Sequence, residues 1–251
     1  MNELTLEPNV SKENLMEKNN KPGFRDLLKF IALSFILSFV LGFILGVFQI
    51  HLKFPQIFAY GMAFFNAFTT IILLDYFMCR KYNNTVNDGF NLKPVNNNVN
   101  IILVVAGIIL AIVGMAINIY LASVQTSQGG GDIEQLPIFS MINTNIYLFL
   151  IFILISPFYE EVLYRGLIYD VLIKKINPFW TILFSGILFS LAHFGQTNTF
   201  SIFYLMFMGV VFGIARYKTG STKASILFHY YYNITVGLGT FISVKILPMF
   251  I

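Results

Sequence analysis

The chain has 251 residues, of which 57% are hydrophobic and only 11% are charged, with a formal net charge of +4. Soluble domains carry about 25% charged residues, so the composition excludes an ordinary soluble protein and indicates a polytopic membrane protein. The lysines and arginines stand at the ends of apolar segments, so the positive charge indicates membrane topology rather than nucleic-acid binding. Because lipid satisfies no backbone polar group, the apolar segments predict an all-α helix bundle.

In chain order, the hydrophobic segments predict about seven transmembrane helices. A polar tail at residues 1–26 precedes a bundle at residues 27–251 that is embedded in the lipid bilayer, and the long first segment favours a retained signal anchor. The predicted spans are Leu27–Ile50, Ile57–Met78, Ile101–Val124, Asn145–Ile173, Pro178–His193, Phe200–Tyr217 and Lys223–Ile246. The asparagine-rich residues 82–99 predict a linker with little regular structure. Gly129-Gly130-Gly131 lacks the lysine of a P-loop and predicts a flexible connection.

Basic residues set the predicted orientation. With a cytoplasmic N-terminus, thirteen lysines and arginines fall in cytoplasmic segments and two, Lys53 and Lys245, fall outside. This asymmetry agrees with seven spans and predicts an external C-terminus. The single cysteine, Cys79, allows no internal disulfide and matches no metal-binding spacing.

Three ionisable side chains, Glu160, Glu161 and Arg165, end the apolar run from Ile146 to Ile155. Each charge costs at least ~2.5–3.5 kcal/mol at the centre of a membrane helix, and its default interpretation is a functional site. Glu161 and Arg165 are four residues apart, so they are predicted to pair on one helix face. Glu160 points elsewhere and is left as a carboxylate for general-base work. The alternative is a patch at the membrane edge that snorkels to water and holds helices together.

Two histidines lie in later predicted spans, His193 near the end of one and His229 near the start of another. Phe189, four residues before His193, is predicted to pack against its imidazole. Asn233, four residues after His229, shares its helix face, and two donors there would stabilise an oxyanion or act as interhelical glue worth ~1 kcal/mol. Counting ~1.5 Å per residue places His193 ~22 Å and His229 ~9 Å along their helices, which predicts different depths.

In order, these residues form three patterns that resemble the motifs of the CAAX-protease and bacteriocin-processing (CPBP, or Abi) family of intramembrane endopeptidases. The patterns are Glu160-Glu161-x-x-x-Arg165, followed by Gly166, then Phe189-x-x-x-His193 and His229-x-x-x-Asn233. The resemblance covers residues from about 145 to 240 and implies that they form the catalytic core. It implies that Glu160 and His193 activate a water. It further implies that His229 and Asn233 hold the oxyanion, with Glu161 and Arg165 as the supporting ion pair.

The resemblance also implies a substrate class and a metal. The family includes enzymes that trim prenylated CAAX proteins and bacterial members tied to bacteriocin immunity and peptide maturation. It therefore implies a lipidated or membrane-associated protein, or a peptide precursor, as substrate in a bacterial plasma membrane. Family members are often labelled metalloproteases, and Glu160, His193 and His229 would supply three Zn²⁺ ligands with an open fourth position, although no His-Glu-x-x-His motif supports this.

Two functions without catalysis stay open as alternatives: a membrane immunity or binding protein, and a small transporter. A transporter should show internal repeats, whereas the polar groups here gather in the C-terminal half. A binder that had lost catalysis would be expected to lack a motif residue, and all six are present. The sequence predicts no oligomeric state.

Overall fold

The computed structural model describes residues 21–52, 55–127, 146–194 and 199–242. Throughout these ranges the regular elements are helices and none is a β-strand, which confirms the predicted all-α bundle. The longer helices are α2 (Phe24–Leu52), α3 (Pro55–Leu74), α5 (Asn97–Ser127), α7 (Ile146–Glu161), α9 (Pro178–Leu191), α10 (Thr199–Thr219) and α11 (Thr222–Phe241). The shorter ones are η1 (Asp75–Cys79), η2 (Arg80–Tyr82), α4 (Val86–Gly89), η4 (Val162–Ile168) and α8 (Tyr169–Leu172).

The helices follow the predicted spans closely. Within the part of the chain that the structure describes, three stretches are long and apolar enough to cross a membrane, namely Phe24–Ile44, Asn97–Ile117 and Ser201–Thr219. Large side chains such as Phe35 and Phe39 on α2 are exposed, as expected for a surface that faces lipid. The bundle is therefore that of an integral membrane protein, whereas the number seven and the orientation stay predictions. The predicted glycine-triplet loop lies outside the described residues.

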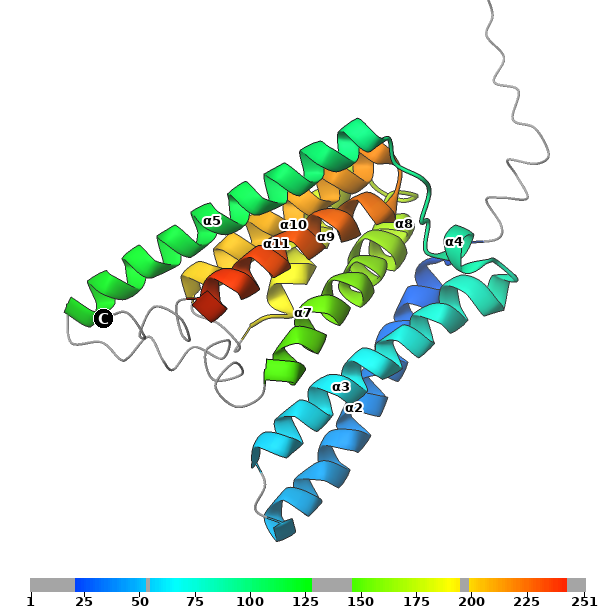
Figure 1. The fold of residues 1–251 in the computed structure, drawn as a ribbon. Coiled ribbons are helices and arrows are strands. Elements are labelled where there is room, and N and C mark those ends of the chain that lie inside the picture. The colour runs from blue at the N-terminus through cyan, green and yellow to red at the C-terminus, as the bar shows by residue number, and fades with distance from the viewer. Residues whose placement is uncertain (1–20, 53–54, 128–145, 195–198, 243–251) are drawn as a thin grey trace, which may run out of the picture.

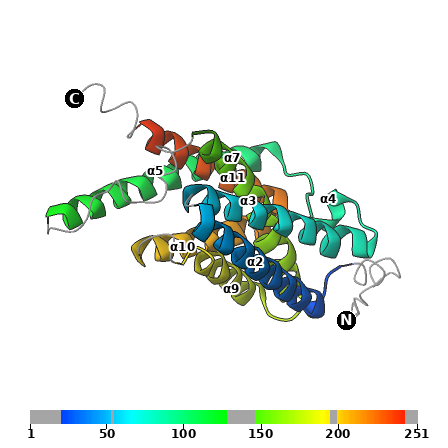
Figure 2. The same cartoon turned by 90° about the horizontal axis from the view of Figure 1, so that it is seen from below.

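Helix α7 and its continuation occupy the middle of the bundle. Helix α11 packs against α5, α7 and α10, and α9 packs against α10. Figure 1 shows α5, α10 and α11 on one side of α7 and the α2–α3 hairpin on the other, and Figure 2 shows the same bundle turned by 90°. The segment η4, which continues α7, contacts α3, α9, α10 and α11. Its side chains are consequently held from several directions.

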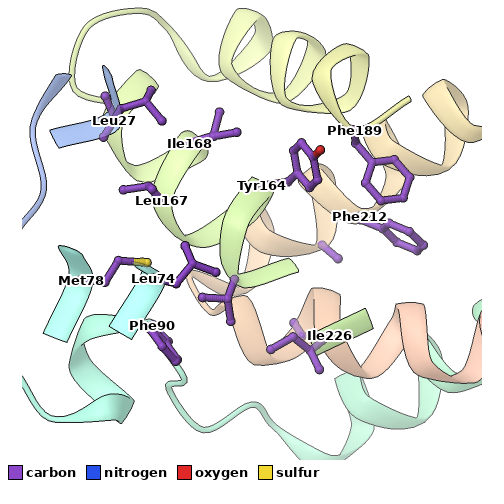
Figure 3. Packing of buried hydrophobic residues seen from close by; sticks show 14 of the residues in the cluster. Leu27, Leu74, Met78, Phe90, Tyr164, Leu167, Ile168, Phe189, Phe212 and Ile226 are labelled. Carbon is purple, nitrogen blue, oxygen red and sulfur yellow. The ribbon is translucent and has the colours of Figure 1, made fainter. Parts of the chain in front are cut away.

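The buried core surrounds η4. Its residues Val162 and Leu167 are fully buried. Figure 3 shows Leu167 and Ile168 beside Leu27 and the Leu74–Met78 region, with Phe189 and Phe212 near Tyr164. The widened turn that follows the two glutamates is therefore packed on all sides rather than exposed to lipid.

The start of α2 is tied to the rest of the bundle by polar contacts. Asp26 pairs with Lys81 and accepts a hydrogen bond from the Tyr82 hydroxyl. Lys174, which follows α8, donates to the carbonyl of Pro22 over 2.9 Å. Helix α2 begins at Phe24, inside the predicted polar tail, because these contacts order the residues before the apolar run.

The linker at residues 82–99 is more ordered than predicted. The Thr85 hydroxyl accepts from the backbone N–H of Asp88 and caps the one-turn helix α4. Asn91 is left-handed, with φ of 55°, and its carbonyl accepts from the backbone N–H of Thr222 over 3.0 Å. The expectation of little regular structure is therefore wrong here. Contacts with the start of α11, which composition does not reveal, hold the linker in place.

Candidate active site

The acidic motif lies where the helical run widens. Pro157 is inside α7, Glu160 and Glu161 end that helix, and the π-helix η4 begins at Val162. Pro157 cannot donate a backbone hydrogen bond, which weakens the ladder just before the motif. Single π-helical turns within helices are frequent at functional sites, because the extra residue per turn displaces the side chains that follow. Here the displaced turn carries Arg165.

Glu161 and Arg165 form the ion pair that their spacing predicts. Arg165 Nη1 donates to Glu161 Oε1 over 3.0 Å, and both side chains have 0% exposure. Arg165 Nη2 also donates to the carbonyl oxygen of Gly209 on α10 over 2.6 Å. The guanidinium lies 4.9 Å from the ring centroid of Phe189 and 5.4 Å from that of Phe212. Charge, hydrogen bonds and ring faces thus fix the arginine in one position.

Glu161 has a second partner, which the sequence did not predict. His229 Nδ1 lies 2.9 Å from Glu161 Oε1, and both groups are buried. The same ring stacks on Phe212, with ring centroids 4.6 Å apart and planes at 23°. His229 Nε2 lies 4.0 Å from Glu160 Oε2, which is too long for a hydrogen bond. The two adjacent carboxylates therefore have different surroundings. Glu161 contacts the Arg165 guanidinium and the His229 Nδ1, whereas Glu160 faces the Nε2 of the same imidazole at a longer distance.

His193 lies in the turn that follows α9 and is partly exposed. Its Nδ1 is 2.9 Å from the carbonyl oxygen of Phe189, and its ring packs on the Phe189 ring with centroids 5.0 Å apart, as predicted. The His229 ring lies 5.7 Å from the same phenyl ring. Both imidazoles thus contact one side chain, and the prediction of different depths is wrong. That prediction assumed that helices α9 and α11 begin at the same depth in the membrane.

Asn233 lies one turn after His229, and its side chain also faces α7. Its Nδ2 donates to Ser156 Oγ over 3.4 Å. Ser156 is buried and stands one turn before Glu160 on the same helix. Helix α7 therefore contacts the Asn233 amide at one turn and faces the His229 imidazole at the next.

Three contributors to this arrangement were missed from the sequence. Phe212 supports His229, the carbonyl of Gly209 binds Arg165, and Ser156 contacts Asn233. A phenylalanine, a glycine and a serine in apolar helices give no local signal of such roles. Only the packing of α7, α10 and α11 brings them to the site.

Zinc binding by Glu160, His193 and His229 stays a prediction that the placement of these side chains does not support. Within the described ranges, no three His, Cys, Asp or Glu side chains form a group that could hold a metal ion. Glu160, His193 and His229 all lie in these ranges, so as placed they do not fit a zinc site.

Comparison with known proteins finds a family that is similar to the segment carrying the three motifs. Residues 142–235 match the family described as type II CAAX prenyl endopeptidase Rce1-like, which confirms the resemblance that the three motifs predicted. The match spans less than half of the chain and contains all six motif residues. No curated protein and no solved structure matches the chain. Residues 142–235 are thus similar to the type II CAAX prenyl endopeptidases.

Proposed function

We propose that the protein hydrolyses a peptide bond within the membrane, with Glu160 and His193 activating the attacking water. The observation that carries this proposal is that the two adjacent glutamates have different partners. Glu161 binds Arg165 and His229, whereas Glu160 Oε2 faces His229 Nε2 across 4.0 Å. A carboxylate that is buried yet not neutralised by the nearby arginine is suited to accept a proton.

The hydrogen bonds of the two imidazoles support different roles for them. A backbone carbonyl can only accept, so His193 Nδ1 carries the proton that it donates to Phe189, and its Nε2 is free to accept from water. An ionised carboxylate also only accepts, so His229 Nδ1 donates to Glu161. In the imidazolium form, balanced by Glu161, His229 Nε2 donates as well. His193 thus joins Glu160 as an acceptor, and His229 provides a donor.

These groups account for a balanced hydrolysis. The water oxygen adds to the carbonyl carbon as its proton passes to Glu160 or His193, and the carbonyl oxygen becomes an oxyanion. His229 Nε2–H and the Asn233 amide donate to that oxyanion, as oxyanion-hole donors do. The C–N bond then breaks, and the departing amine takes the proton that the base had accepted. The products are a free amine and a carboxylic acid, which releases the second proton of the water to become a carboxylate.

The substrate that we propose is a lipidated, CAAX-like protein terminus, with a membrane-bound peptide precursor as the second candidate. The family description supports the first, because it names a prenyl endopeptidase. The burial of the site in an apolar bundle supports both, since a lipid-anchored or hydrophobic peptide partitions to that depth. A role in bacteriocin immunity would use the second substrate class.

Mass spectrometry of the products tests this proposal. Purified protein in detergent is incubated with a farnesylated peptide that ends in Cys-aliphatic-aliphatic-X, and with a hydrophobic peptide lacking the lipid. We expect cleavage of the farnesylated peptide after its cysteine, with one oxygen atom from ¹⁸O-labelled water in the new carboxylate. Cleavage of the unlipidated peptide alone would favour precursor processing. If neither peptide is cut while the protein retains its fold, the non-catalytic binding function replaces this one.

A further inference from the structure

A second buried ion pair lies outside the three motifs. Arg216 Nη2 on α10 donates to Asp170 Oδ1 on α8 over 2.6 Å, and both residues are buried. A buried pair pays a desolvation cost that its attraction need not recover, so its presence is weak evidence for a stabilising role. Its contacts with the motif segment indicate what it does instead.

Arg216 holds the backbone next to the catalytic motif. Its Nε donates to the carbonyl oxygen of Arg165 over 3.1 Å while Nη2 binds Asp170, and its guanidinium lies 5.0 Å from the Tyr169 ring centroid. The planar, forked guanidinium of Arg216 thus contacts the segment η4–α8 at two positions that are five residues apart. A lysine ammonium has no such fork and cannot reproduce both contacts with one geometry.

Helix α10 holds Arg165 from two sides. The Gly209 carbonyl accepts from the guanidinium of Arg165, and Arg216, seven residues or two turns further on, binds the backbone carbonyl of the same residue. Helix α9 adds a hydrogen bond from Ser185 Oγ to the carbonyl of Tyr164 over 3.0 Å. Both the backbone and the side chain of Arg165 are therefore fixed relative to α10.

A chain of direct contacts links Arg165 to the groups that are proposed to take part in the reaction. Arg165 binds Glu161, and the same carboxylate oxygen binds His229. We propose that Asp170 and Arg216 are positioning residues for the hydrolysis, which set the place of Arg165 and through it the orientation of Glu161 and His229. This inference rests on the proposed function, because neither residue touches the reacting atoms.

Arg216→Lys is the most informative variant, because it keeps the charge that pairs with Asp170 and removes the fork. We expect kcat for a farnesylated, fluorophore-labelled CAAX peptide to fall by roughly 10- to 100-fold, with KM unchanged. A loss of this size is typical when a residue that orients a catalytic group is replaced. Arg80→Lys is the matched control, since Arg80 forms the same kind of pair with Asp75 on an exposed surface. It should leave both constants as in the wild type.

A double variant separates positioning from folding. Asp170→Leu/Arg216→Met removes the pair without leaving a buried charge unpaired, so the bundle should keep its thermal stability. We expect it to show the kcat loss of Arg216→Lys together with faster hydrogen exchange over residues 162–170. The exchange is measured whether or not the peptide is cut. Wild-type kcat and wild-type exchange in both variants would overturn the inference.

Glu160→Gln, run in parallel, distinguishes the two levels of the proposal. If Glu160→Gln cleaves like the wild type, the proposed function fails. If Glu160→Gln is inactive but Arg216→Lys retains full kcat, the catalytic assignment stands and the positioning role of Arg216 is refuted. A fall in the thermal stability of Arg216→Lys with kcat unchanged would make the pair purely structural and would also refute that role.

Discussion

The buried pair of Glu161 and Arg165 makes a quantitative prediction. Glu161→Gln leaves the guanidinium of Arg165 fully buried, with the Gly209 carbonyl and aromatic faces as its remaining partners. Removing one member of a buried pair costs about 3–5 kcal/mol, and the surviving contacts place this case at about 3 kcal/mol. For a protein of this size that loss lowers Tm by roughly 6–12 °C.

Thermal unfolding of the purified protein in detergent, arranged as a double-mutant cycle, measures this effect. Arg165→Met removes the guanidinium from the buried carboxylate of Glu161 and leaves the His229 imidazole as its partner, and we expect it to destabilise the fold by a similar amount. Combining it with Glu161→Gln removes both charges, so the double variant should recover much of the loss, with a coupling of about 2–3 kcal/mol.

The exposed pair of Asp75 and Arg80 is the control for this cycle. The Arg80 side chain is 78% exposed and that of Asp75 is 25% exposed, so solvent screens their attraction. The corresponding coupling should be about 0.2–1 kcal/mol. Equal coupling in the two cycles, or additive effects of Glu161→Gln and Arg165→Met, would refute the reasoning that burial makes the first pair interdependent.

Four further predictions concern single contacts and the metal. Gly209→Ala places a Cβ 2.9 Å from Gly186 and should separate α9 from α10, at a cost of about 1–3 kcal/mol in thermal unfolding; an unchanged Tm would contradict this close packing. Ser156→Ala removes the partner of Asn233 and should lower kcat roughly 2- to 10-fold, the equivalent of one hydrogen bond, whereas a change in KM alone would not fit. Burial and the hydrogen bond to Asp26 raise the pKa of Tyr82 to about 12. Its contribution to stability is therefore complete below about pH 10 and lost towards pH 12, and Tyr82→Phe should flatten this decline in Tm. Incubation with EDTA or phenanthroline should leave the cleavage rate unchanged; loss of activity that Zn²⁺ restores would instead assign the metal to Glu160 and the two histidines.

The parts of the site that follow local rules could be predicted from the sequence. The pairing of Glu161 with Arg165 and the packing of Phe189 on His193 depend on a separation of four residues along a helix. The spans themselves follow from hydropathy, because lipid permits few alternatives to a helix.

The parts that depend on tertiary packing could not be predicted. Glu161 and His229 are 68 residues apart, and no spacing rule links them. Asp170 and Arg216 are 46 residues apart, and no local pattern indicates their buried ion pair. The different depths inferred for the histidines were wrong because the rise per residue locates a side chain along its own helix only, not between helices.

The most direct measurement is the rate at which Glu160→Gln cleaves the farnesylated CAAX peptide. Glu160→Gln retains the size of the side chain and removes its ability to accept a proton, so we expect kcat to fall by at least ~100-fold, with Tm near that of the wild type. Asp75→Asn is the corresponding change in a carboxylate that lies outside the three motifs and pairs with the exposed Arg80, and it should cleave like the wild type. A Glu160→Gln protein that cleaves at the wild-type rate would contradict the assignment of Glu160 as the group that activates water.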